Sequence, residues 1–250
     1  MYKYMAGNIT VYNTSALDIS ENAKKSEISE TISRWIVENC ERDIIYNSIE
    51  QNYEGFSKSD TEFIASSAAS RLERGKERRI QTISEEIFEY LSSAESINIM
   101  GFIRFRLKEY RKEIEEIIDM TVEKYICERE YYEFIELLRE YIRLRPFGFD
   151  ILNVISNGKR NFYLDKNGND LTKAFQKEYA FDMDLTEDDK LLTALVLSVP
   201  QKIIWHGWDK IKSEEIKKTL VEIFGGKIYL CKGCKLCRKY NKYGNILKKY

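Results

Sequence analysis

The sequence predicts an α+β protein whose first half is mainly helical and whose second half mixes strands and helices. Three observations lead to this fold class. Apolar residues recur in alternating steps of three and four over residues 102–144, which predicts a long central helix. Two β-rich runs flank Asn157-Gly158 and predict a hairpin. A strand, a helix and a second strand over residues 202–231 predict a βαβ-like unit that ends in a cysteine turn.

The change of character near Pro146 divides the chain into a mainly helical region, residues 1–147, and a mixed α/β region, residues 148–250. A chain of 250 residues has room for one large domain or two small ones, so the two regions could also pack as one domain. The composition, 43% hydrophobic and 32% charged, is that of a soluble globular protein. A net charge of -1 gives the whole chain no attraction to polyanions or membranes.

The expected location is the cytoplasm. The first residues lack the basic and apolar regions of a signal peptide. The longest apolar run, at residues 191–199, is far shorter than the roughly 20 residues of a membrane-spanning helix. Three of the 5 cysteines fall in one short motif, whereas a secreted disulfide framework would spread them along the chain. We therefore expect no membrane span.

Several helices and one strand are predicted in the first region. Residues 8–14 predict a short strand, and apolar residues at helical spacing from Ser26 predict a helix. The sequence SDTE, residues 59–62, resembles a capping box that would open another helix, and TISE, residues 82–85, would open the next. The stretch 102–144 is then one long helix or two nearly continuous ones.

Turn and cap residues organise the second region. Asn157-Gly158 is a favoured pair for a two-residue type I′ turn, and Asn167-Gly168 marks a turn after the second strand. The sequence TEDD, residues 186–189, would cap a buried helix. Ser213 would open a further helix, which Gly225-Gly226 would end.

The strongest chemical signal is CKGCKLC, which places Cys231, Cys234 and Cys237 at C-x-x-C-x-x-C spacing. If the strands at residues 202–206 and 227–231 are parallel, a right-handed crossover brings their carboxyl ends to one edge of the sheet. His206, the only histidine of the chain, ends the first strand, and Cys231 ends the second. We therefore predict a metal site formed by the three cysteines and His206. Thiolates and imidazole suit zinc, usually in a tetrahedral site.

Other interpretations of these residues stay open. An iron–sulfur cluster can use this spacing but is less favoured, because the fourth cysteine of the ferredoxin pattern is replaced here by Asn241. The thiols could also be reduced and without special chemistry, or form a C-x-x-C pair that cycles as a disulfide. His206 could then be a structural residue without a ligand role. Cys40 and Cys127, in apolar stretches, are expected to be buried small side chains.

The residues after Cys231 are basic, contain no acidic residue and are interleaved with tyrosines. This composition is typical of a nucleic-acid contact, and the candidate residues are Arg238, Lys239, Lys242, Lys248 and Lys249. A solvated C-terminal tail is the favoured alternative, because the whole chain is near neutral. The sequence has no P-loop, dinucleotide-binding or nucleophile-elbow motif, so we do not expect an enzyme with a known catalytic set.

Two stretches resemble a known family. GFIRFRLKEYRKEIEEIIDM and the helical residues after it, at 101–142, are similar to the central helix of the YtxC family of endospore-forming bacteria, as is the run from LLTALVLSVPQKIIWH to CKGCKLC, residues 191–237. The resemblance covers most of the chain and is weakest before residue 57. It implies an association with sporulation. It implies no biochemical activity, catalytic residue or cofactor, so the metal prediction rests on the cysteine spacing alone.

The sequence thus predicts a cytoplasmic, sporulation-associated protein that acts by binding an unidentified protein partner. A metal such as zinc would stabilise its C-terminal end, where little core is available. One alternative is a redox or metal-dependent enzyme that uses the cysteine cluster. The other is a nucleic-acid-associated factor that uses the basic C-terminal residues.

Overall fold

The structure is a computed structural model that describes residues 19–94, 96–178 and 185–246. Side chains are described from residue 23 to residue 240, apart from the same internal gaps. Within these residues the chain is an α+β protein with a mainly helical first half, which confirms the predicted fold class. The strand predicted at residues 8–14 lies outside the described residues.

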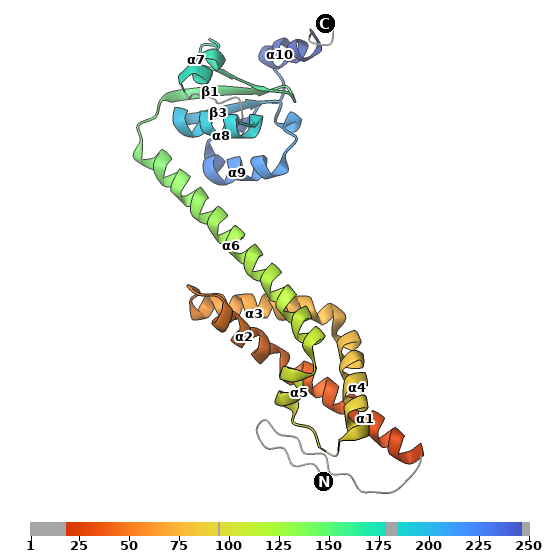
Figure 1. The fold of residues 1–250 in the computed structure, drawn as a ribbon. Helices are drawn as coiled ribbons and strands as arrows, with labels where there is room; N and C mark the ends of the chain where they lie inside the picture. The colour runs from red at the N-terminus through yellow and green to blue at the C-terminus, as the bar shows by residue number, and fades with distance from the viewer. Residues whose placement is uncertain (1–18, 95, 179–184, 247–250) are drawn as a thin grey trace. The chain divides into compact units, whose positions relative to one another are not determined.

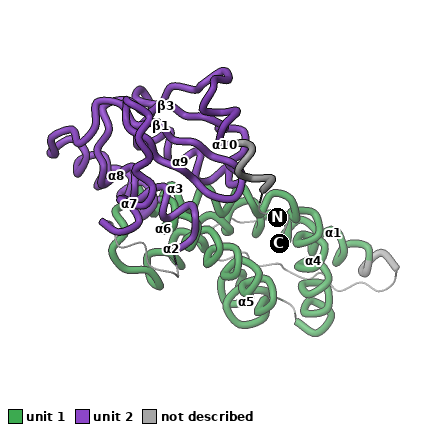
Figure 2. Tube along the Cα trace, turned by 90° about the horizontal axis from the view of Figure 1, so that it is seen from above, with its two compact units in different colours: residues 1–128 green, residues 129–250 purple. Residues whose placement is uncertain are grey.

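The chain forms two compact units, residues 1–128 and residues 129–250 (Figure 2). Helix α6 (Lys108–Leu144) contributes residues to both. The boundary expected from the sequence, between residues 147 and 148, stays a prediction. Along the described residues, the structure contains no helix that is both long enough and apolar enough to cross a membrane.

The described residues of the first unit form helices (Figure 1). These helices share one apolar core. The helices are α1 (Ile19–Asn39), α2 (Glu41–Asn52), α3 (Lys58–Leu72), α4 (Lys76–Ser93), α5 (Ile99–Phe105) and the first part of α6. The helix predicted from Ser26 is part of α1. The stretch 102–144 forms two nearly continuous helices, because only Arg106 and Leu107 separate α5 from α6.

Two helix starts in this unit differ from the prediction. The Ser57 hydroxyl caps α3 by accepting a hydrogen bond from the Asp60 N–H, and the Asp60 carboxylate accepts one from the Ser57 N–H. The capping box predicted at residues 59–62 is therefore wrong by two residues, since Asp60 occupies the third helical position. The start predicted at residues 82–85 is also wrong: α4 runs through them, and the Thr82 hydroxyl donates to the Arg78 carbonyl.

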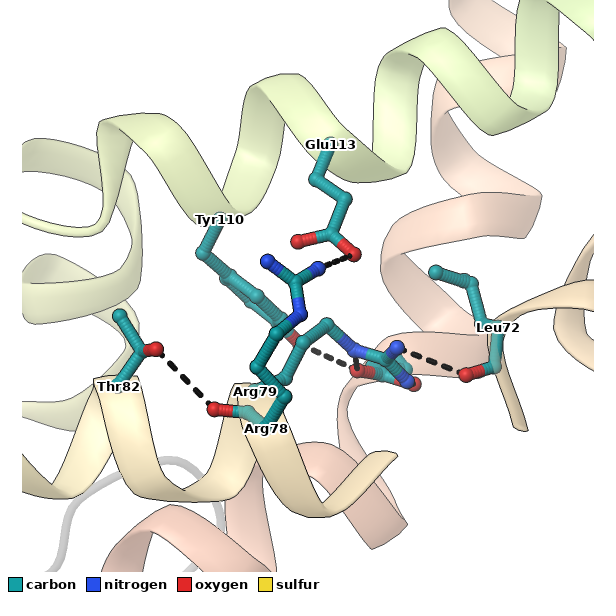
Figure 3. Close-up of polar contacts among 7 residues, drawn as sticks. Leu72, Arg78, Arg79, Thr82, Tyr110 and Glu113 are labelled. Atoms are coloured by element: carbon teal, nitrogen blue, oxygen red, sulfur yellow. Dashed lines mark hydrogen bonds and ion pairs between the residues drawn. The ribbon is translucent and has the colours of Figure 1, made fainter. Parts of the chain in front are cut away.

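A buried ion pair connects α2 to α4 in the first unit (Figure 3). Arg79 donates from Nε and Nη2 to the two carboxylate oxygens of Glu41, at 2.8 and 3.1 Å. Its Nη1 donates to the Leu72 carbonyl at 2.7 Å, and the Tyr110 hydroxyl of α6 donates to Glu41 at 3.3 Å. A charge is tolerated in a core when it is paired and its remaining hydrogen-bonding positions are filled, as they are here.

The second unit contains a four-stranded mixed sheet with strand order β2-β1-β3-β4. The strands are β1 (Phe149–Ser156), β2 (Asn161–Leu164), β3 (Pro200–His206) and β4 (Ile228–Leu230), and the helices are α7 (Thr172–Glu178), α8 (Glu187–Ser198), α9 (Glu214–Phe224) and α10 (Lys235–Ile246). β1 is antiparallel to β2 and parallel to β3. β3 is parallel to β4, and α9 connects them, which confirms the predicted βαβ unit.

Different helices cover the two faces of this sheet, and Figure 1 shows α10 on the side opposite α8 and α9. The face that packs with α8 and α9 carries the buried side chains of Leu152, Val154, Ile203 and Trp205. The face that packs with α10 carries Ile155, Phe162 and Leu164, which contact Leu236 and Tyr240 of that helix. The alternation of side chains along each strand therefore places His206, next to Trp205, on the α10 face.

The hairpin between β1 and β2 differs in detail from the prediction. Ser156 pairs with Asn161, which leaves a loop of residues 157–160 in place of the two-residue turn expected at Asn157-Gly158. The Asn157 carboxamide oxygen accepts hydrogen bonds from the N–H groups of residues 159 and 160, at 3.0 and 3.1 Å. This side-chain turn lengthens the loop.

Three further local predictions in the second unit are confirmed. A turn lies at residues 167–168, where Gly168 has a left-handed backbone. Thr186 and Asp189 form the capping box of α8. Ser213 caps α9 by accepting a hydrogen bond from the Ile216 N–H at 3.1 Å.

Candidate metal centre

The carboxyl ends of β3 and β4 bring His206 and Cys231 together. The Cys231 N–H donates to the Trp205 carbonyl at 2.8 Å, so Cys231 continues β4 beside the end of β3. Gly207 follows the histidine with a left-handed backbone (φ +75°), and a Cβ at this position would collide with the Ser156 carbonyl oxygen. β3 therefore ends at His206, and its imidazole stays at the edge of the sheet.

A tight turn and the start of α10 position the cysteines. Gly233 adopts a φ of +115°, which favours glycine, and its N–H donates to Cys231 Sγ at 3.4 Å. Cys234 immediately precedes α10, and its carbonyl accepts the Arg238 N–H at 3.2 Å. Cys237 lies three residues further on, so it shares a helix face with Cys234.

The four side chains converge on one point. Their ligand atoms all lie within 4.8 Å of one another. His206 Nδ1 lies 3.3 Å from Cys237 Sγ and 3.5 Å from Cys234 Sγ. Cys237 Sγ lies 3.9 Å from Cys234 Sγ and 3.8 Å from Cys231 Sγ. A tetrahedral zinc ion would place its sulfur ligands about 3.8 Å apart and sulfur and nitrogen about 3.6 Å apart, so the group could hold one such ion.

A buried amide orients the histidine. Asn153 Nδ2 donates to the Asp165 carbonyl at 3.0 Å, which turns its Oδ1 toward His206 Nε2 at 3.2 Å. Because Oδ1 only accepts, Nε2 carries the proton, and the lone pair of Nδ1 faces the cysteines. A hydrogen bond to the nitrogen that faces away from the metal site fixes the tautomer that binds a metal.

The electrostatics of the group differ from one ligand to the next. Burial lowers the pKa of His206, which favours the neutral imidazole. Burial would raise the pKa of the Cys234 thiol, but hydrogen bonds from the N–H groups of Cys237 and Leu236 and from the neighbouring thiols lower it overall. Burial, with a smaller contribution from the neighbouring thiols, raises the pKa of Cys237 to about 11. The Cys234 thiol is thus more easily ionised than the Cys237 thiol.

The residues predicted for nucleic-acid contact have different positions. Arg238 and Lys239 are exposed on α10. Lys242 falls within α10 but its side chain is outside the described residues, and Lys248 and Lys249 lie outside them entirely. The nucleic-acid contact and its alternative, a solvated C-terminal tail, both stay predictions. Residues 235–246 form α10, in which Leu236 and Tyr240 contact the sheet.

At other positions, predictions from the sequence were wrong or were not made. Cys40 is buried as expected, but Cys127 is exposed, because it lies off the helical stripe that places Ile118 and Val122 in the core. Helices α2, α7 and α10 were not anticipated. Asn153 was missed as well, although a polar residue within the buried strand 151–155 is a signal that could have pointed to it.

Fold and site together define an α+β protein with a histidine–cysteine group that could hold a metal ion. The chain belongs to the YtxC-like family, which it matches over residues 26–229. This match includes His206 and ends before Cys231. A similar protein is "Uncharacterized protein YtxC" of Bacillus subtilis (strain 168), which is 23% identical over 132 residues, or 51% of this chain and 46% of the relative. The chain therefore matches about half of the length of that relative, and no solved structure matches it.

Proposed function

We propose that this chain is a zinc-binding protein in which His206, Cys231, Cys234 and Cys237 hold one structural zinc ion. The observation that carries the proposal is the convergence of their four ligand atoms within 4.8 Å, at spacings close to the edges of a tetrahedron. A single ion fits these spacings better than a 4Fe–4S cluster, which binds each cysteine through a different iron and needs the sulfurs farther apart.

A structural role follows from the number and placement of the ligands. Four protein ligands complete a tetrahedral shell and leave no open position for a reacting water. His206 is only 3% exposed, and its partner Asn153 is buried as well. The ion would join the edge of the sheet to the start of α10, which otherwise contacts the sheet through Leu236 and Tyr240. Metal binding would thus stabilise the position of α10.

The biological role that we propose is binding to a partner in the cytoplasm during sporulation. The sporulation association comes from the family resemblance, and the cytoplasmic location from the reduced cysteines that a thiolate site requires. No catalytic set accompanies the cysteines among the described residues, so we propose a binding protein in place of an enzyme.

Elemental analysis with an absorption spectrum tests the metal. The full chain, purified without chelator, is compared with Cys234→Ser and with Cys127→Ser, which removes an exposed cysteine outside the group. We expect about one zinc per chain in the wild type and in Cys127→Ser, and strongly reduced zinc in Cys234→Ser. A natively folded wild type without metal, in which every thiol titrates, would overturn the proposal. A brown chromophore would indicate an iron–sulfur cluster instead.

A second candidate function is thiol–disulfide exchange, which the lowered pKa of Cys234 favours. The Cys234 thiolate would attack a protein disulfide and release one substrate thiolate. The Cys237 thiol would then lose its proton and displace the mixed disulfide, so that the substrate leaves reduced and a Cys234–Cys237 disulfide remains. One assay distinguishes thiol–disulfide exchange from a structural zinc site. Metal-free protein that forms this disulfide in a glutathione buffer supports exchange, whereas zinc-loaded protein that resists oxidation supports the structural site.

A further inference from the structure

We propose that the α10 face of the sheet in the second unit binds single-stranded nucleic acid. The proposal rests on the proposed zinc site, because the ion would fix α10 in place. The surface comprises Lys232, Lys235, Arg238 and Lys239 around the start of α10, and Lys202 and Tyr229 on β3 and β4. We call these residues the basic surface.

The first part of the basic surface is one side of α10. Lys235, Arg238 and Lys239 fall at positions i, i+3 and i+4, which share a helix face. All three are exposed, whereas Leu236 and Tyr240 on the other side pack against the sheet. The printed sequence has no acidic residue after Cys231, and none of these three cations has an ion pair among the described residues. This side of the helix therefore presents positive charge to the solvent.

The second part lies on β3 and β4, where Tyr229 is exposed. Tyr229 pairs with Ile204, so it shares the face of His206 and α10. Its side chain is 50% exposed, and Lys202 Nζ lies 4.2 Å from the centroid of its ring. An aromatic surface and a cation thus occur together on an uncovered part of the sheet.

The loop between β1 and β2, residues 157–160, adds one more cation, Arg160, near α10. Arg160 lies 4.8 Å from the centroid of the Phe162 ring, and that ring lies 4.9 Å from the ring of Tyr240. Since Tyr240 belongs to α10, Arg160 lies near the helix and is itself exposed. The positive charge therefore extends from β4 to the hairpin of β1 and β2.

The combination of groups favours single strands over other polyanions. Cations along a surface neutralise phosphates, and an exposed ring on a sheet provides a stacking position for an unpaired base. A duplex keeps its bases stacked inside and cannot use Tyr229. A membrane surface would engage the lysines but has no base to stack on the ring. The net charge of the chain is -1, so the attraction must come from this local surface.

Fluorescence anisotropy tests the proposal with a labelled 20-nucleotide single strand of mixed sequence, as DNA and as RNA. The full chain is compared with the triple variant Lys235→Gln/Arg238→Gln/Lys239→Gln and with Tyr229→Ala. The matched control is Arg42→Gln/Arg71→Gln/Lys108→Gln, which removes the same charge from exposed positions in the first unit. Each protein is also titrated with the blunt duplex and with phosphatidylserine vesicles, and its zinc content is measured.

The expected results separate charge from stacking. The α10 triple variant should lose at least about tenfold in affinity for the single strand, and the slope of log affinity against log salt should fall by about two, because three phosphate contacts are lost. Tyr229→Ala should lose about fivefold or more with an unchanged salt slope, because stacking involves no counterion. The control triple variant should bind like the wild type.

Three outcomes would overturn the inference: a wild type that does not bind the single strand, equal losses in the α10 and control variants, or tighter binding to the duplex or the vesicles. Zinc content reports separately on the proposed function. Variants that keep wild-type zinc and lose the single strand support both proposals. Zinc-loaded wild type without affinity for the single strand overturns only the nucleic-acid site. Metal-free wild type that still binds the single strand overturns the zinc site and the need for zinc at the basic surface, but leaves the nucleic-acid site standing.

Discussion

Asn153 decides which nitrogen of His206 faces the cysteines, because its amide is itself fixed by the Asp165 carbonyl. Replacing it with alanine removes the acceptor for Nε2 and frees the imidazole to change tautomer. We expect Asn153→Ala to bind zinc about tenfold more weakly or worse, because metal affinity usually falls by this much when a ligand loses its hydrogen-bond partner. Competition with a zinc chelator measures this change.

The control for this prediction is Asn167→Ala, which alters an exposed asparagine of the same unit. It should keep wild-type zinc affinity. Equal zinc affinity in Asn153→Ala and the wild type would show that the amide does not position His206.

Gly207 allows β3 to end directly after the histidine. Its left-handed φ and the close Ser156 carbonyl together exclude a side chain. Gly168 also has a left-handed φ, but a Cβ there would meet no atom within 4 Å. We expect Gly168→Ala to cost about 1 kcal/mol of local stability from the backbone conformation, and Gly207→Ala clearly more, because the clash adds to it.

Hydrogen exchange of peptides from β1 and β3 measures both effects, since it reports local opening free energies in a chain with more than one unit. If the two substitutions cost the same, the contact with Ser156 contributes nothing, and the account of how β3 ends would be wrong.

Among the secondary-structure elements, α3 shows how a correct signal can be assigned to the wrong residue. Ser57 and Ser59 both have an acidic residue three positions later. Only at Ser57 does that residue, Asp60, accept a hydrogen bond from the serine N–H. Ser57→Ala should therefore cost about 1 kcal/mol, the usual value of a lost cap, and Ser59→Ala close to nothing. Hydrogen exchange at the start of α3 distinguishes them, and the reverse order would restore the cap predicted from sequence.

The buried ion pair of Arg79 and Glu41 connects α4 to α2. Arg79→Met leaves the buried Glu41 carboxylate without its partner, so we expect a loss of about 3–5 kcal/mol. The double variant with Glu41→Met should lose less than the sum of the single variants, because no charge is left unpaired. Arg78→Met breaks the more exposed pair with Glu113 and should cost under about 1 kcal/mol. Hydrogen exchange in α4 measures these values, and strict additivity would contradict the coupling.

Element by element, the sequence predicted what local chemistry determines. The long apolar stripe, the caps at Thr186 and Ser213 and the strand before His206 depend on nearby residues. Helix α10 was not predicted, because its apolar face is limited to a few residues. That face is buried only because Phe162 and Ile155, from other parts of the chain, pack against it. The hairpin turn was missed because the Asn157 side chain competes with the two-residue turn.

For the molecule as a whole, the predicted site followed from topology. The parallel order of β3 and β4 is what places His206 beside Cys231, and a single sequence carries that information through the strand–helix–strand pattern. The role of Asn153 could not be predicted in the same way, because it comes from β1, far away in sequence and adjacent only through the sheet register. The division into units 1–128 and 129–250 likewise depends on contacts over long distances.

We propose above that one zinc ion is bound by His206, Cys231, Cys234 and Cys237. Zinc X-ray absorption on the full chain, purified without chelator, tests it most directly. We expect three sulfur ligands at about 2.3 Å and one nitrogen at about 2.0–2.1 Å, with the nitrogen contribution altered in His206→Ala and unchanged in Asn167→Ala. A first shell of oxygen and nitrogen without sulfur, or a shell unaffected by the loss of His206, would contradict it.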